Sequence, residues 1–316
     1  ARTMPYQHHW RYIFGLIIGL LASSVNALPQ PQQVSPHVWA WIGPYEGPAK
    51  ANQGFRMNLG FVVGTQAVAV IDSGYTPDMA REMLSQIRAI TPLPVLYVIN
   101  TNSQPHRFMG NDVFRQAGAR IIAASEAAER MQNEGHAFAS GIAATLELPE
   151  PPAVPEIPEI LIDGGAGERL DLGGSVTLRI EHYGRTHTRG TLVVQVTPDQ
   201  TVFAGDILYG GRLLAILPDS HVGMWITAFE RLRSVEAKVF IPGHGKPGAL
   251  ADFEHPTYAY LSGLKTHMDL AIENGTDMAE ATTSFDAQPW STLANFSELA
   301  GRNASFAYLE REAESF

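Results

Sequence analysis

Short apolar runs, each closed by turn residues, are the feature that most constrains the fold of this chain. Strand-like runs occupy residues 38–42, 57–63, 67–71, 95–99, 120–123, 168–172, 176–181, 192–196, 201–204 and 238–241. Helical patterns lie between or after them, at residues 77–90, 112–117, 125–144, 221–235, 251–274 and 303–311. Because the strands form meanders interrupted by single helices, the pattern predicts an α/β fold, a layered sandwich of mixed sheets with helices outside.

The composition limits the chemistry that such a fold can carry. The 316 residues are 45% apolar and 17% charged, which is typical of a globular chain with a full core, and they include no cysteine. Thiolate nucleophiles, disulfides and Cys-bound metals are therefore excluded, so any metal must be held by histidine and carboxylate side chains. The net charge is −10 and no run of Lys or Arg occurs, which argues against a nucleic-acid partner.

The first 27 residues have the pattern of an export sequence. Basic residues precede the apolar run 13–22, and small and polar residues lead on to Ala27. The run is shorter than the ~20 residues that a membrane-spanning helix needs. We expect a cleaved signal peptide, with an uncleaved N-terminal anchor or a buried N-terminal helix as alternatives. The protein is then periplasmic or secreted and meets a membrane only through this segment, if it is uncleaved.

The rest of the chain is predicted to form one domain with a short extension. Residues 28–36 are polar and Pro-rich and are interpreted as a linker, while residues 37–275 hold the strand pattern. Five prolines within residues 149–158 exclude a helix or an inner strand and indicate a surface connection inside this domain. Residues 276–316 are expected to form a C-terminal helical extension packed on the domain.

Polar residues lie at the ends of several apolar runs. Asp72, Asp206 and His244 each end such a run, His106 lies in the loop after residues 95–99, and His187 lies in a loop before a strand. Ligands are usually held where loops emerge from strand ends, so these residues are candidates for a site. Taken singly, each has a plainer alternative, namely a solvated histidine or an aspartate that caps its own turn.

Six short motifs surround these candidates. In chain order they are Asn-Leu-Gly-Phe-Val-Val-Gly, Val-Ile-Asp-Ser-Gly, Val-Ile-Asn-Thr, Gly-Arg-Thr-His-Thr-Arg-Gly-Thr-Leu-Val-Val, Phe-Ala-Gly-Asp and Ile-Pro-Gly-His-Gly. Together they resemble the metallo-β-lactamase-fold hydrolases over about residues 38–271. Within that family the chain resembles the exported members linked to quinoprotein relay systems and the glyoxalase-II-like members. The resemblance implies a four-layer αββα sandwich and a metal-dependent hydrolase.

The metal-binding motif of that family is altered in this chain. The family has His-x-His-x-Asp-His directly after the Asn-Thr step. Here the four ligand positions hold Asn102, Gln104, His106 and Arg107, so none keeps its own residue type. Amide oxygens are poor zinc ligands, so the resemblance implies that the first metal site is empty or very weak.

Three other ligands of the family, His187, Asp206 and His244, are retained. The resemblance implies that the second metal site keeps Asp206 and His244, and that His106 adds an imidazole to it. Two histidines and one carboxylate can hold a single zinc or iron ion. Asp206 and His187 would then be the catalytic residues, with His187 orienting the substrate or transferring a proton.

Arg107 leaves different hypotheses open, because it places a permanent cation where a metal ligand should be. The chain could be a hydrolase of an ester, thioester or lactone with one zinc or iron ion. It could instead be a metal-free, inactive pseudoenzyme in which Arg107 pairs with Asp206. Such a pseudoenzyme would be a periplasmic binding or accessory protein, with a small-molecule ligand or a periplasmic protein partner. A scaffold that only stabilises a larger complex is the remaining alternative.

Other residues give weaker indications. Asp72 resembles a family residue that steadies the metal-binding loop from behind, although it could simply cap its own turn. Arg185 and Arg189 could contact an anionic substrate or be solvated. Four aromatic residues could line a substrate groove or pack in the core, namely Trp39, Trp41, Tyr45 and Phe55. Three histidines without partner spacing are interpreted as structural, namely His221, His255 and His267.

Overall fold

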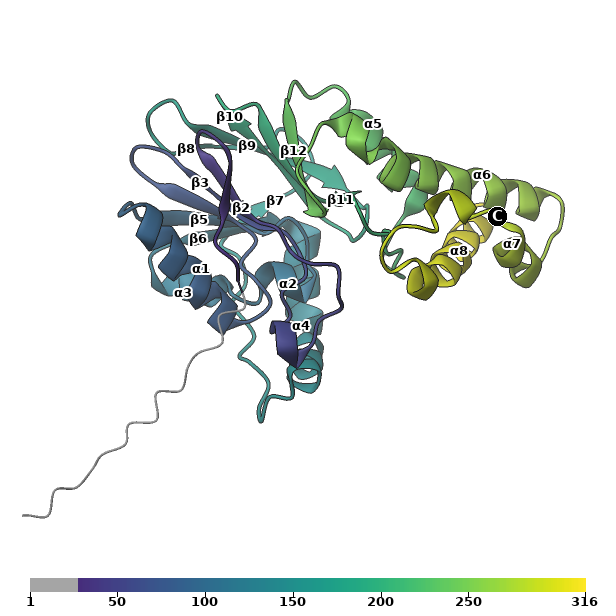
Figure 1. Cartoon of the computed structure of the whole chain (residues 1–316), viewed down its shortest axis with the longest axis horizontal. Helices are drawn as coiled ribbons and strands as arrows, with labels where there is room; N and C mark the ends of the chain where they lie inside the picture. Colours follow the sequence, from purple (N-terminus) through teal and green to yellow (C-terminus); the bar gives the residue numbers. More distant parts are fainter. Residues whose placement is uncertain (1–27) are drawn as a thin grey trace, which may run out of the picture.

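The computed structural model describes residues 28–316, which form two stacked β-sheets with helices on their outer faces (Figure 1). The export sequence predicted for residues 1–27 lies outside the described residues. Within residues 28–316, no helix has both the length and the apolar character that crossing a membrane requires.

The first sheet has seven strands, which lie side by side in chain order. They are β1 (Gln32–Ser35), β2 (Val38–Trp41), β3 (Leu59–Val63), β4 (Val68–Ile71), β5 (Val95–Ile99), β6 (Arg120–Ala124) and β7 (Ile160–Ile162). Neighbours from β1 to β4 are antiparallel, and those from β4 to β7 are parallel. Because parallel neighbours end at the same edge, β4 and β5 bring the residues that follow them close together.

The second sheet has five strands. They are β8 (Glu168–Asp171), β9 (Thr177–Gly184), β10 (Thr191–Thr197), β11 (Thr201–Tyr209) and β12 (Val239–His244), and they also lie in chain order. Only β11 and β12 are parallel, so their carboxyl ends meet at one edge. The β11–β12 register is irregular on both sides of Gly205, and an irregularity of this kind re-aims nearby side chains such as that of Asp206.

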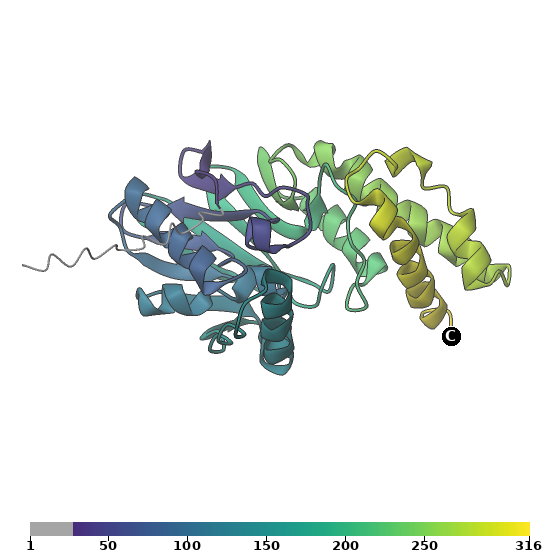
Figure 2. The ribbon, with the colours of Figure 1, turned by 60° about the horizontal axis from the view of Figure 1, so that its bottom comes forward.

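Helices pack on the outer faces of the two sheets. They are α1 (Pro77–Ile90), α2 (Pro105–Phe108), α3 (Asn111–Gln116), α4 (Ser125–Leu146), α5 (Val222–Leu232), α6 (Tyr260–Glu273), α7 (Met278–Ser284) and α8 (Phe296–Ala313), with short 3-10 turns at Lys50–Asn52 and Gln288–Trp290. Of these, α7 and α8 extend beyond the sheets beside α6 (Figure 1). One core joins Met83 of α1, the first sheet and inward residues of the second sheet such as Val194. The other core joins outward residues such as Val193 to Trp225 of α5 and Leu264 of α6. This stacking confirms the expected four-layer αββα sandwich (Figure 2).

The prediction of a linker over residues 28–36 is wrong in its second half, because Gln32–Ser35 form the edge strand β1. Contacts with the other sheet hold this strand in place. The Ser35 hydroxyl and the His37 backbone N–H donate to Asp199 Oδ2 at 2.6 and 2.7 Å. Prolines flank β1, which only an edge strand tolerates, so a Pro-rich sequence concealed the strand.

The long helix predicted for residues 251–274 is also wrong in form. A 3-10 turn at Leu250–Phe253 and a wide π turn at Glu254–Ala259 precede α6. Pro256 lacks a backbone N–H, so it cannot complete a regular α-helical pattern there. The final helix is longer than predicted, since α8 begins at Phe296 rather than near residue 303.

Residues 276–316 form α7 and α8, and α8 packs on α6 (Figure 1). Ala304 and Ala307 of α8 belong to the second core. The Asn303 side chain ties α8 to the loop after β11, because its Nδ2 donates to Leu214 O at 2.7 Å and its Oδ1 accepts from the Ile216 N–H at 2.8 Å. The C-terminal helix is thereby held beside the strand ends where the candidate site lies.

Candidate functional site

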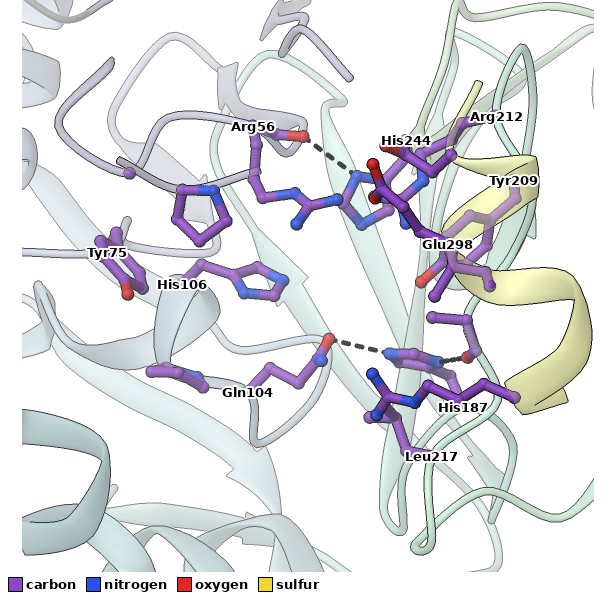
Figure 3. Close-up of a pocket in the computed structure, with 17 residues that line it drawn as sticks. Arg56, Tyr75, Gln104, His106, His187, Tyr209, Arg212, Leu217, His244 and Glu298 are labelled. Carbon is purple, nitrogen blue, oxygen red and sulfur yellow. Dashed lines mark hydrogen bonds between the residues drawn. The ribbon is translucent and has the colours of Figure 1, made fainter. Parts of the chain in front are cut away.

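The candidate residues gather around one pocket at the strand ends (Figure 3). His106 lies on α2 after β5, His187 lies between β9 and β10, Asp206 lies on β11, and His244 ends β12. The cavity has a volume of about 410 Å³, and the three histidines line it. Asp206 is buried behind them, with its Oδ1 3.4 Å from His244 Nε2.

The loop that carries the altered motif is closed by a pair of amides. Asn100 and Asn111 exchange side-chain hydrogen bonds of 2.9 and 2.8 Å across it. The Arg107 carbonyl accepts from the Asn100 side chain and from the Ser73 N–H, both at 2.9 Å. Pro105 begins the short helix α2, where a missing N–H has no cost. The backbone of Arg107 is thus fixed on both sides.

The guanidinium of Arg107 lies at the centre of the site and is 1% exposed. Its Nη2 donates to Asp206 Oδ1 at 2.6 Å and its Nη1 to Asp72 Oδ2 at 3.2 Å. Nη1 also donates to Asn58 O at 2.7 Å, and Nη2 to Gly243 O at 3.2 Å. The pairing of Arg107 with Asp206 that the sequence suggested is therefore present, and a second carboxylate, Asp72, joins it.

The two amides of the altered motif complete this network. Asn102 Nδ2 donates to Asp206 Oδ2 at 2.6 Å, so both oxygens of that carboxylate already have close partners. The side-chain amide of Gln104 lies 3.0 Å from His187 Nε2, and the other ring nitrogen of His187 lies 2.8 Å from Ala215 O. These residues do not fit a two-metal centre, because hydrogen bonds among protein groups occupy the positions of its ligands.

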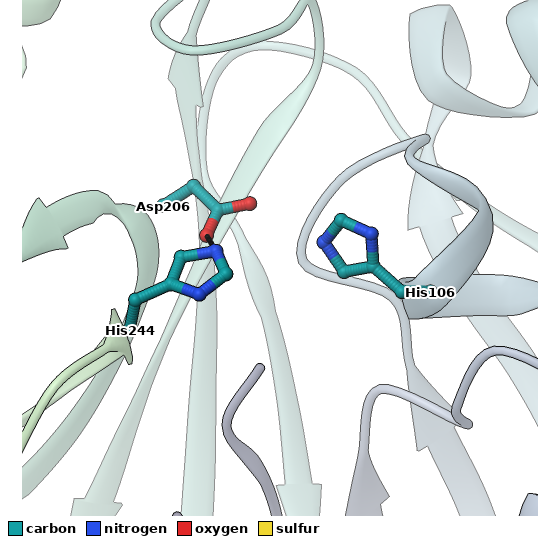
Figure 4. A group of neighbouring side chains, drawn as sticks. All are labelled: His106, Asp206 and His244. Atoms are coloured by element: carbon teal, nitrogen blue, oxygen red, sulfur yellow. Dashed lines mark ion pairs between the residues drawn. The ribbon is translucent and has the colours of Figure 1, made fainter. Parts of the chain in front are cut away.

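A smaller group retains the character of a metal site (Figure 4). One ligand atom each from His106, Asp206 and His244 lie within 4.8 Å of one another. His106 Nε2 is buried and has no hydrogen-bond partner. His244 Nδ1 lies 3.1 Å from the Arg56 carbonyl and donates to it, so the Nε2 of the neutral ring turns a lone pair toward Asp206. The donor set fits one divalent ion, although the carboxylate is shared with Arg107.

Asp72 supports the site from behind. Its Oδ1 accepts the Thr101 N–H and its Oδ2 accepts the Thr101 hydroxyl, both at 2.7 Å, and Oδ2 also accepts from Arg107. Asp72 itself adopts a left-handed backbone conformation with φ of 64°. Asp72 was predicted either to steady this loop from behind or to cap its own turn. The contacts with Thr101 and Arg107 agree with the first of these roles.

Burial and charge together set the protonation of the site. Burial would raise the pKa of Asp206, but the Arg107 charge outweighs it and holds that pKa well below its ordinary value. Burial raises the pKa of Asp72 to about 6, against the opposing effects of Arg107 and Thr101. Burial also lowers the pKa of His187 to about 4 and holds the pKa of His106 and His244 well below the ordinary value. All three rings are therefore neutral at pH 7.

Some of the weaker candidates lie elsewhere. Arg185 donates to the Asp219 carbonyl and Arg189 pairs with the Asp219 carboxylate, and neither lines the pocket. Trp39 stacks on Phe61 in the sheet. The other three aromatic candidates also stay outside the pocket lining, namely Trp41, Tyr45 and Phe55. The structural interpretation of three histidines agrees with their contacts to backbone groups, namely His221, His255 and His267.

Several residues that line the pocket were not predicted from the sequence. Arg56, Tyr209 and Arg212 line the cavity, as do Glu298 and Arg302 of α8. Arg56 lies just before the first family motif and Arg212 lies just after the end of β11. Their position next to a motif is the only signal by which the sequence could have indicated that they line the pocket. Nothing in the sequence could place α8 against the strand ends at Tyr209 and His244, which lie far before it in the chain.

Replacing Gly243 with alanine is expected to disturb the Arg107–Asp206 pair and lower the free energy of unfolding by about 1–3 kcal/mol. A Cβ at Gly243 would overlap Asp206 Oδ1 and lie 2.8 Å from Arg107 Nη2. Urea unfolding measures the effect. Gly141→Ala is the control, because a Cβ on this exposed residue of α4 meets nothing within 4 Å. It should stabilise the helix by about 1 kcal/mol, and equal effects of the two variants would contradict the prediction.

The stacked sheets and the histidine and aspartate residues at their strand ends define a four-layer α/β sandwich with a possible metal-binding group. Residues 54–244 match the Metallo-beta-lactamase superfamily. Because this match covers more than half of the chain, the chain belongs to that superfamily and is a relative of its metal-dependent hydrolases. Among solved structures it is similar to the metallo-beta-lactamase from Pontibacter korlensis. The two share 19% sequence identity and a TM-score of 0.59, over 73% of this chain and 98% of the other.

Proposed function

We propose that this chain is an exported, metal-independent protein that binds a small molecule in a former hydrolase pocket. The observation that carries the proposal is the fully buried Arg107 guanidinium, which lies 2.6 Å from Asp206 and 3.2 Å from Asp72. A permanent cation at this position supplies the positive charge that the two carboxylates require. Export rests on the predicted leader in residues 1–27 alone.

The remaining groups favour binding over turnover. Both oxygens of the buried Asp206 already accept hydrogen bonds, from Arg107 and Asn102, and the Arg107 charge makes this carboxylate a weak base toward water. Both ring nitrogens of His187 face protein groups, Ala215 and Gln104. His187 therefore forms part of the pocket wall and does not orient a nucleophile. With these groups engaged, the two residues expected to act in catalysis, Asp206 and His187, are not free to serve as the general base.

One observation favours a second candidate, a single-metal hydrolase of an ester, thioester or lactone. His106 Nε2 has no partner and the Nε2 lone pair of His244 faces the Asp206 carboxylate, so a cation between these groups would satisfy all three. His106, His244 and Asp206 would hold the ion. When bound, a zinc or iron ion would polarise a substrate carbonyl and supply a nucleophilic water.

Metal content separates the two candidates. Protein purified without chelator and then dialysed against zinc or iron is expected to hold less than about a tenth of an equivalent, because Arg107 opposes a divalent ion. The comparator restores the family motif with Asn102→His, Gln104→His, His106→Asp and Arg107→His. It is expected to hold about two equivalents and to hydrolyse ester substrates.

One equivalent of metal in the wild type, lost in His106→Ala and kept in His136→Ala, would establish the second candidate instead. His136 is exposed on α4 and serves as the matched control. A reverted protein that folds but takes up no metal would contradict the view that the altered motif is what silenced the site.

A further inference from the structure

Three arginines face the pocket without taking part in the Arg107 network. Arg56 lies in the loop before β3, Arg212 follows β11, and Arg302 lies on α8. Glu298 is the one acidic residue among the lining side chains. Figure 3 shows Arg56, Arg212 and Glu298 around the same opening as the histidines. The pocket wall therefore carries an excess of positive charge in a protein whose net charge is −10.

Arg56 and Arg212 line the pocket without a direct carboxylate partner among the described residues. Arg212 is 4% exposed, yet its one hydrogen bond runs from Nε to the Leu213 carbonyl at 3.2 Å, and its guanidinium lies 5.4 Å from the centre of the Tyr209 ring. Arg56 Nε is buried without a hydrogen-bond partner. No carboxylate of residues 28–316 lies within ion-pair distance of either guanidinium. Arg212 is buried and Arg56 is half-buried, and buried charges are costly unless they are paired, so this arrangement favours binding of an anion in the pocket.

The two guanidinium groups also act on each other. Burial lowers the pKa of Arg56, and the charge of Arg212 lowers it further, while the charges of Asp206 and Glu298 oppose this in part. Asp206 forms its ion pair with Arg107 rather than with Arg56 or Arg212. The neutral imidazoles add no charge. An anion between Arg56 and Arg212 would relieve this repulsion and accept their unused N–H donors.

The rest of the lining indicates what the anion is attached to. Tyr75, Tyr209, Leu217 and Leu299 supply aromatic and aliphatic surface. A cavity of about 410 Å³ is the size of pockets that hold small organic molecules. We propose that the pocket binds a small organic anion, whose carboxylate or phosphate group is held by Arg56 and Arg212 and whose apolar part lies against this surface. The inference rests on the proposed binding function and specifies its ligand class.

Paired probes test the charge requirement. Calorimetric titration of the full chain at low ionic strength compares phenylacetate with phenylacetamide and phenyl phosphate with phenol. At least one anion is expected to bind at least about tenfold more tightly than its neutral partner, because charge-assisted hydrogen bonds to arginine are lost in the neutral compound. The stronger anion of the two identifies the carboxylate or the phosphate as the preferred head group.

Variants assign the binding to the named residues. Arg56→Gln and Arg212→Gln are each expected to lower the affinity for the preferred anion at least about tenfold. Arg302 is exposed, so Arg302→Gln is expected to lower this affinity by only a few-fold. If Arg212→Gln does not fold, Arg212→Lys replaces it in the test. Because Arg212→Lys keeps the charge, it should retain part of the affinity for the anion. Arg189→Gln is the matched control, since Arg189 pairs with Asp219 outside the pocket, and it should bind like the wild type.

Two different failures are distinguishable. Equal binding of each anion and its neutral partner, or no binding of any probe up to about 10 mM, would overturn the anion inference and leave the metal-free site intact. Anion binding that zinc restores and chelator removes would place the anion on a metal and overturn the proposed function itself. Full affinity in both Arg56→Gln and Arg212→Gln would show that the anion lies elsewhere.

Discussion

Replacing Arg107 with methionine is expected to lower the free energy of unfolding by about 3–5 kcal/mol, because it leaves two buried carboxylates without their cation. Asp72 and Asp206 are 2% and 1% exposed, so water cannot take the place of the guanidinium. Four hydrogen bonds from Arg107 would also be lost, two of them to the Asn58 and Gly243 carbonyls. Equilibrium unfolding in urea measures the change.

Three further variants separate charge from packing. Arg107→Lys keeps the charge, but a lysine cannot donate to two carboxylates in the planar geometry of a guanidinium. An intermediate loss in the free energy of unfolding is therefore expected. The double variant Arg107→Met with Asp206→Asn removes one of the unpaired charges and should be more stable than Arg107→Met alone. Arg233→Ala breaks an exposed ion pair with Glu254 and should cost less than about 1 kcal/mol. A loss in Arg107→Met no larger than in Arg233→Ala would contradict the central role of the buried pair.

Much of the layered fold could be predicted from the sequence, because burial leaves a clear periodic pattern. The helix predicted for residues 77–90 and the strand predicted for residues 95–99 coincide with α1 and β5. The edge strand β1 was missed because edge strands tolerate polar residues and flanking prolines. The start of α6 was missed because the apolar pattern continues through Pro256, where the hydrogen-bond pattern changes.

The candidate site was predictable only in part. The altered motif placed Arg107 and Asp206 together because the family order fixes which strand ends meet. The order of the motifs does not predict that Asn102 donates to Asp206 or that Gln104 contacts His187, because these contacts depend on side-chain orientation. Arg302 could not be predicted, because α8 reaches the pocket through packing of helices that have no counterpart in the quoted motifs.

The second large effect is a loss of stability between pH 7 and pH 5. Burial keeps His106, His187 and His244 neutral in the folded chain, whereas the unfolded chain protonates them below about pH 6.5. The unfolded state then binds more protons, so stability falls as the pH falls. Each ring would contribute about 2 kcal/mol at pH 5. Asp72 opposes this by about 1 kcal/mol, since its raised pKa lets the folded state take up a proton in the same range.

A net loss of roughly 5 kcal/mol is therefore expected from pH 7 to pH 5, measured by urea unfolding at several pH values. Asp206 adds nothing in this window, because its lowered pKa matters only below about pH 4. His187→Gln should remove about one third of the histidine contribution, and His136→Gln, on the exposed face of α4, is the matched control variant. An unchanged stability over this range would mean that at least one buried ring is already charged at pH 7. His244 would then be the first residue to examine, since its two ring nitrogens both face oxygen atoms.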